Sequence, residues 1–142
     1  MDADLLAILA AWSVATLRSA TPLIFTTLGE TLTQRVGVIN LGIEGEMLMG
    51  ACVGFAVGVA TNNPWLGLMA GALAGALLSL VYAFLVLVAQ TNQIGSGLAV
   101  WMIALGTTSY FGRALVGQQV TPLPDLGSAW MADIPFLGAL FN

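Results

Sequence analysis

The chain has 142 residues, of which 58% are hydrophobic and only 7% are charged. Soluble domains carry about a quarter charged residues, so this composition excludes an ordinary soluble protein. With no histidine, no lysine and one cysteine, the sequence excludes a zinc site, a disulfide framework, a Ser-His-Asp triad and a Schiff-base lysine. We expect no metal and no cofactor. Three arginines within a net charge of −4 give no basic face, so nucleic acid is not expected as a partner.

The middle of the chain is apolar and uncharged, with no charged residue between Met47 and Gly112. At about 1.5 Å per helical residue this stretch spans roughly 100 Å, enough for about three crossings of a ~30 Å hydrocarbon core. An N-terminal apolar stretch, interrupted by Arg18 and Pro22, adds another crossing. The sequence therefore predicts an all-α polytopic membrane protein with about four transmembrane helices, at about 5–28, 40–61, 65–89 and 94–112.

The two ends of the chain differ from this apolar middle. The start is acidic at Asp2 and Asp4, where a secretory signal needs positive charge, so we interpret 5–28 as a membrane span. Residues 118–142 contain three prolines and two aspartates, which predicts an extracytoplasmic loop with a short interfacial helix. The positive-inside rule applied to Arg35 places both termini outside, although Arg113 argues for the opposite orientation.

Small residues recur at four-residue spacing in two of the predicted spans. Such stripes let helix backbones approach closely, and van der Waals contact then replaces the hydrophobic driving force that lipid does not provide. Glycine is common in membrane helices, so these stripes favour a packed bundle and say little about what the bundle does. The predicted packing glycines are Gly50, Gly54, Gly58, Gly67, Gly71 and Gly75.

A polar, glycine-rich segment at 35–46 stands at the start of the second span. Its glycines weaken regular helix, and freed backbone groups are tolerated in a bilayer only where protein or a water-filled cavity satisfies them. The segment therefore predicts a helix broken beside a polar path, as at the midplane sites of transporters. Stabilisation of a helix N-terminus by the macrodipole is the alternative for Glu44 and Glu46, and we favour a functional role only for Glu44.

A second polar cluster, at 92–97, opens the fourth span with the neutral side chains of Asn92, Gln93 and Ser96. Amide and hydroxyl groups suit hydroxyl-rich or nucleobase ligands better than ions. Interfacial capping of the helix is the alternative for this cluster.

Three stretches carry a resemblance to a known family: SATPLIFTTLGETLTQRVGVINLGIEGEMLMGA (19–51), NQIGSGLAVWMIALGTTSY (92–110), and VTPLPDLG with IPFLGALFN (120–142). They resemble the membrane permease of bacterial nucleoside and simple-sugar ABC importers, within the branched-chain amino acid and ribose permease family. The resemblance implies a multi-pass inner-membrane subunit, surrounded by membrane lipid. It also implies three protein partners: a second permease, a cytoplasmic ATPase and an extracytoplasmic substrate-binding lipoprotein.

Permeases of that family are longer, so the chain resembles their N-terminal half, with the C-terminal half and its ATPase-docking loop absent. Glu46 departs from the family pattern, in which an apolar residue is more usual at this position. The resemblance implies that the candidates for the translocation path are Asn40, Glu44, Asn92, Gln93 and Ser96.

We therefore expect a permease subunit, not an enzyme, that forms part of the translocation pathway for nucleosides or simple sugars. It would not hydrolyse ATP, because it has no GxxxxGK[ST] phosphate loop and no lysine. Two alternatives stay open. A membrane scaffold or assembly subunit would need only the glycine stripes, and a passive channel is the other. The broken polar segment argues against the scaffold.

Overall fold

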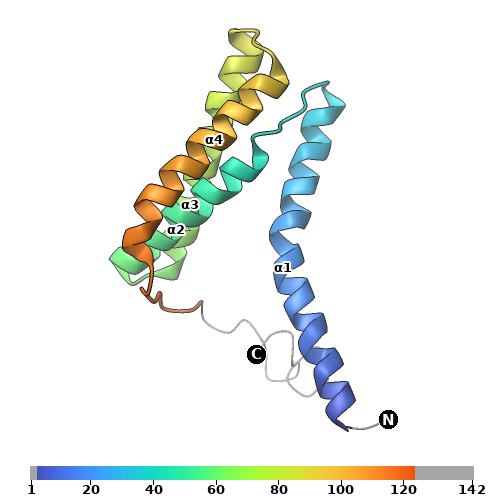
Figure 1. Cartoon of the computed structure of the whole chain (residues 1–142), viewed down its shortest axis with the longest axis vertical. Coiled ribbons are helices and arrows are strands. Elements are labelled where there is room, and N and C mark those ends of the chain that lie inside the picture. Colours follow the sequence, from blue (N-terminus) through green and yellow to red (C-terminus); the bar gives the residue numbers. More distant parts are fainter. Residues whose placement is uncertain (1–2, 124–142) are drawn as a thin grey trace. The chain divides into compact units, whose positions relative to one another are not determined.

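The computed structural model describes residues 3–123, and within that range it contains helices and connections but no strand (Figure 1). The expected interfacial helix of the tail falls mostly on 124–142, outside the described residues. Of the described residues, 3–29 belong to one unit and 30–123 form a second. The elements are α1 (Ala3–Arg35), α2 (Ile43–Thr61), α3 (Pro64–Ala83) with the π-helical η1 (Phe84–Val88), α4 (Gln93–Phe111), and the 3₁₀-helical η2 (Gly112–Leu115).

Helix α1 continues without a break through Pro22. Several of its hydroxyl groups donate to a carbonyl one turn earlier: Ser13 to Leu9 and Thr16 to Trp12, each at 2.8 Å. These bonds satisfy polar side chains within the helix itself, which lets hydroxyls sit in an apolar segment without an outside partner. Pro22, which interrupts the apolar stretch in the sequence, thus lies inside one helix.

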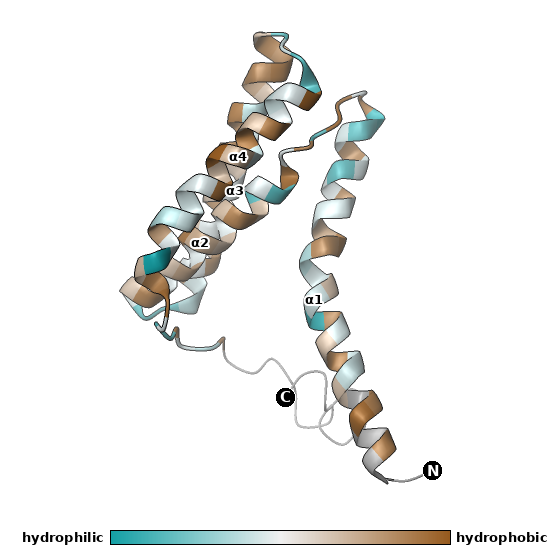
Figure 2. Cartoon of the chain, in the orientation of Figure 1, coloured by the Kyte–Doolittle hydropathy of each residue, from teal (hydrophilic) through white to brown (hydrophobic). Residues whose placement is uncertain are grey.

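Three of the described helical stretches are long and apolar enough to cross a membrane: Ile43–Thr61, Pro64–Val88 and Gln93–Leu115. Their outer faces carry most of the large exposed apolar side chains, and Figure 2 shows brown along these helices with teal near their ends. Lipid or apolar protein can cover such faces. The all-α polytopic class predicted from the sequence is confirmed. The first predicted span, 5–28, falls on α1 and stays a prediction.

Asparagine side chains fix where two of these helices begin. Asn63 accepts hydrogen bonds from the backbone N–H groups of Trp65 and Leu66, and Pro64 occupies the first position of α3. Asn92 accepts from the Gly95 N–H at the start of α4. Both are N-caps of the usual kind, in which a side-chain oxygen satisfies amides that have no partner inside the helix.

The two glycine stripes of α2 and α3 lie against each other. A β-carbon at Gly71 would stand 2.7 Å from the Gly50 carbonyl oxygen, and one at Gly67 would stand 2.7 Å from the Gly54 carbonyl oxygen. Real side chains do not approach that closely, so only glycine permits this contact between the backbones. The pairing of Gly50 with Gly71 and of Gly54 with Gly67 runs in opposite chain directions, as expected for helices joined by a short turn.

Helix α4 packs against the N-terminal part of α2 through another close contact. A β-carbon at Gly45 would lie 2.8 Å from the Trp101 Cα atom. Beside this contact, Tyr82, Val86 and Val100 form the buried hydrophobic cluster of the described residues. The small residues thus bring α2, α3 and α4 close enough for polar side chains at one end to reach across.

We expect Gly71→Leu to destabilise the protein, because a leucine would collide with the Gly50 carbonyl and force α2 and α3 apart. Overpacking of this kind costs about 1–3 kcal/mol, and the melting temperature in detergent should fall. The matched control is Gly106→Leu, since nothing lies within 4 Å of a β-carbon at Gly106. Melting like the wild type for both Gly71→Leu and Gly54→Leu would contradict the packing role.

Candidate functional site

The predicted break lies between α1 and α2, where Val36–Gly42 (called the break from here on) is not helical. Helix α2 begins at Ile43 and not at residue 40 as the sequence predicts for the span. The reason is local: the Asn40 Oδ1 atom accepts the Gly42 N–H at 2.9 Å, which is an Asx turn that competes with helix. Gly37 adopts a φ of +82°, a conformation that side chains disfavour.

Asn40 is the centre of the polar contacts at the break. It is only 6% exposed. Its amide nitrogen donates to the Glu46 Oε1 atom at 2.7 Å, and its backbone N–H donates to the Glu30 Oε1 atom at 3.1 Å. One buried residue therefore joins carboxylates from the last turns of α1 and the first turn of α2. Hydrogen bonds to charged groups are the stronger kind, so these contacts hold the break firmly.

Glu30 is itself held in place by its own helix. Its Oε2 atom accepts the Thr33 hydroxyl at 3.0 Å, and its Oε1 atom accepts the Gln34 amide at 3.0 Å. Glu30 was not among the site residues predicted from the sequence. Its spacing from Thr33 and Gln34 could have indicated it, because residues three and four positions apart on a helix are neighbours.

Two side chains from the other helices contact the main chain of the break. The Tyr82 hydroxyl of α3 donates to the Ile39 carbonyl at 2.6 Å. The Gln93 side chain of α4 accepts the Ile39 N–H at 3.0 Å and donates to the Gly37 carbonyl at 3.3 Å. Side chains from α3 and α4 thus supply hydrogen-bond partners for non-helical backbone. Tyr82 was also missed in the sequence, although a buried tyrosine hydroxyl needs a partner.

Glu46 continues the glycine stripe of α2 by one step of four residues toward its N-terminus. On the facing helix, a β-carbon at Gly75 would lie 3.5 Å from the Glu46 carbonyl oxygen, and Ser79 interacts with the Glu46 carboxylate. The Glu46 carboxylate therefore faces the bundle interior. Near the break, the glycine stripes of α2 and α3 therefore continue into a pair of polar residues, Glu46 and Ser79.

The remaining predicted site residues have different surroundings. Glu44 is exposed, and within residues 3–123 it makes no hydrogen bond or ion pair. Asn92 caps α4, as the capping alternative proposes. Ser96 is buried and its hydroxyl lies 2.6 Å from the Thr91 hydroxyl. The structure thus brings Asn40 and Gln93 together at the break, whereas Glu44 points away from that network.

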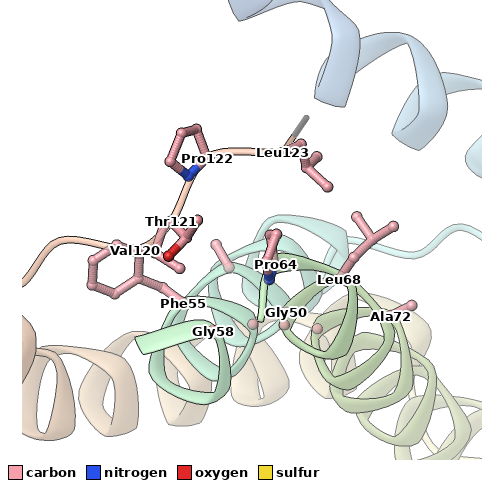
Figure 3. A pocket seen from close by; sticks show the side chains of 14 residues that line it. Gly50, Phe55, Gly58, Pro64, Leu68, Ala72, Val120, Thr121, Pro122 and Leu123 are labelled. Atoms are coloured by element: carbon pink, nitrogen blue, oxygen red, sulfur yellow. The ribbon is translucent and has the colours of Figure 1, made fainter. Parts of the chain in front are cut away.

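A groove at the opposite end of α2 differs sharply in chemistry. It has a volume of about 580 Å³ and lies over the glycine stripes, with Val120–Leu123 along one side (Figure 3). Thr121 is the one polar side chain among its lining residues, and its hydroxyl is bound to the Asn62 Oδ1 atom at 2.6 Å. A hydroxyl-rich solute would find almost no partner there. The lining of this groove is therefore apolar, in contrast to the polar side chains that meet at the break.

The described residues contain no group of three or more acidic, cysteine or histidine side chains that could hold a metal ion. The break therefore offers amides, hydroxyls and two separated carboxylates. Groups of this kind can bind neutral polar molecules or pair with backbone.

A family model described as "Branched-chain amino acid transport system / permease component" matches residues 13–139. The chain belongs to this family. The match includes the break and the polar ends of α2, α3 and α4, so the site described above lies wholly within the permease component.

Three curated relatives are similar to the chain. One from Haloferax volcanii, named as a candidate glucose ABC transporter permease protein (TsgC13), is 37% identical over 89% of this chain and 40% of the relative. The guanosine ABC transporter permease protein NupQ of Bacillus subtilis is 36% identical over 97% and 47%, respectively. The nucleoside ABC transporter permease protein NupC of Lactococcus lactis is 29% identical over 86% and 42%.

The chain thus spans less than half the length of the relatives it matches. No solved structure gives a significant match. The permease family assigns a transport subunit, which agrees with the expectation that the chain is not an enzyme.

We expect Asn40→Leu to destabilise this permease component. The substitution would leave the Glu46 carboxylate without its amide donor and the Gly42 N–H without its acceptor. Each unsatisfied buried group costs about 1–3 kcal/mol, so the melting temperature in detergent should fall clearly. Gln119→Leu is the control, because Gln119 is exposed and has no side-chain hydrogen bond among residues 3–123. Equal melting temperatures of the two variants would show that the Asn40 side chain does not stabilise the protein.

Proposed function

We propose that the chain forms part of the translocation pathway of an ABC importer for nucleosides or simple sugars, in a bacterial inner membrane. In the complete assembly it pairs with a second permease, a cytoplasmic ATPase and an extracytoplasmic substrate-binding lipoprotein. ATP hydrolysis belongs to the ATPase subunit.

The observation that carries this proposal is the joint presence of a permease family match and a polar break beside three apolar helices. A membrane scaffold needs the close glycine contacts but has no use for a non-helical segment bound by carboxylates and amides. Non-helical backbone at membrane depth is characteristic of transport sites. The break therefore favours transport over the scaffold.

The choice of substrate class rests on the relatives and on the chemistry of the chain. The names of the relatives specify glucose, guanosine and nucleosides, which are uncharged molecules rich in hydroxyl groups. Such molecules are recognised by neutral amides and by carboxylates that accept hydroxyl protons. Both kinds of group occur at the N-terminal ends of α2 and α4.

Glu44 is the candidate whose side chain is free to meet a transported molecule. It is exposed on the first turn of α2, whereas the Asn40 amide and both Gln93 heteroatoms are already bound within the chain. An ionised carboxylate facing lipid is costly, so Glu44 should face water or polar protein in the assembled transporter. A water-filled pathway satisfies that requirement.

Uptake by living cells tests the proposal. In a strain that lacks the complete gene encoding this chain, accumulation of radiolabelled guanosine, uridine or glucose should be lost for at least one solute. A plasmid copy should restore it, and a copy with a defective partner ATPase gene should not. Unchanged accumulation of all three solutes in the deletion strain would overturn the proposed function.

The pathway role of Glu44 makes a separate prediction within the complete transporter. We expect Glu44→Gln to raise the KM for uptake, because an amide accepts fewer hydroxyl protons than a carboxylate. A lost charged hydrogen bond of about 1.5 kcal/mol corresponds to about a tenfold change. Glu46→Gln is the matched control, since an amide oxygen can still accept the Asn40 amide proton. Wild-type uptake kinetics in both variants would contradict a pathway role for Glu44 and favour the alternative, in which it stabilises the helix N-terminus.

A further inference from the structure

The Gln93 side chain binds the break at two points. Its Oε1 atom accepts the Ile39 N–H at 3.0 Å and its Nε2 atom donates to the Gly37 carbonyl at 3.3 Å. A primary amide is the neutral side-chain group that offers both an acceptor and a donor in one plane. It can therefore pair with a stretch of backbone as a neighbouring strand would, and both of its heteroatoms are used here.

Tyr82 completes the pairing of the same residue from another helix. Its hydroxyl donates to the Ile39 carbonyl at 2.6 Å, and the side chain is only 3% exposed. Ile39 is thus held on its N–H side by α4 and on its carbonyl side by α3. The next residue, Asn40, gives its backbone N–H to Glu30.

This arrangement has a consequence for transport. Four backbone groups of the break have partners inside the chain: the Gly37 carbonyl, the Ile39 N–H, the Ile39 carbonyl and the Asn40 N–H. A solute could reach them only by displacing a bound side chain. Backbone fixed in this way also fixes where the Asn40 side chain stands, and hence its bond to Glu46.

We propose that Gln93 is a positioning residue which, together with Tyr82, clamps the main chain of the break and does not contact the transported molecule. The hydrogen bonds of Gln93 and Tyr82 to the break support the clamp without reference to transport. Its importance for uptake rests on the proposed function. This assignment differs from the expectation drawn from the sequence, which placed Gln93 among the residues that line the path.

Amide hydrogen exchange of the purified protein in lipid nanodiscs tests the clamp without any transport assay. We expect Gln93→Met, which keeps the side-chain length but removes the donor and the acceptor, to speed exchange in peptides covering 36–42 by about fivefold to tenfold, as for the loss of about one net hydrogen bond. The control is Gln90→Met, because Gln90 is exposed and makes no side-chain hydrogen bond within residues 3–123.

A second variant keeps the test decisive if Gln93→Met disturbs the whole fold, which faster exchange throughout α2 and α3 would reveal. Tyr82→Phe removes a single oxygen atom and should speed exchange in the same 36–42 peptides, whereas Tyr110→Phe should not, since no hydrogen bond of Tyr110 is present in the described part of the chain. Exchange of the break within twofold of the wild type in Tyr82→Phe and in any folded Gln93→Met would overturn the clamp.

Uptake kinetics separate positioning from solute contact. In the complete transporter, Gln93→Met should lower the maximal rate at least fivefold while KM stays within about twofold for every solute carried. A large rise in KM with unchanged exchange of the break would make Gln93 a solute contact and overturn the proposal. Should no nucleoside or sugar be carried at all, the proposed function fails, and the exchange experiment still decides whether Gln93 and Tyr82 hold the break.

Discussion

Backbone groups that leave a helix where other helices pack around them must find partners, and this constraint organises the polar contacts around the break. The break is not helical, so side chains from α1, α3 and α4 pair its backbone groups. Asn40 links the break to Glu30 and Glu46, while Tyr82 and Gln93 hold its main chain. A buried backbone group without a partner is costly, which is why several of the chain's few polar side chains gather at this one place.

Close helix packing is what lets these short side chains reach. A β-carbon at Gly97 would lie 3.0 Å from the Leu41 nitrogen, so α4 passes directly over the end of the break. The Gly45 contact with Trp101 holds α2 against α4 in the same region. With larger residues at these positions the helices would stand farther apart, and the Gln93 amide could not contact two peptide groups. The polar contacts at the break therefore depend on the close helix packing that the glycines permit.

The sequence predicted features that depend on local pattern and missed those that depend on distant partners. Four-residue glycine spacing and a polar interruption are visible in one stretch of chain, so the bundle class and the place of the break could be predicted. The hydrogen bond between Gln93 and Ile39 joins residues 54 positions apart, so no local sequence pattern predicts it. Which of Glu44 and Glu46 faces the bundle could have been inferred, because Glu46 lies four residues before Gly50 and so shares the face of the glycine stripe.

The same geometry divides the polar residues by the work they can do. Asn40, Gln93 and Tyr82 have their polar atoms bound within the chain, and a residue whose donors and acceptors are already paired gains little from binding a solute. Glu44 stands two residues from Glu46 on the same helix, which turns its side chain about 200° away from the glycine stripe. A carboxylate on that outer face of an otherwise apolar helix needs water or polar protein beside it. Under the proposed function, the face of α2 that carries Glu44 is therefore the one that borders the pathway, and the clamped break behind it is the rigid support that holds this face in position.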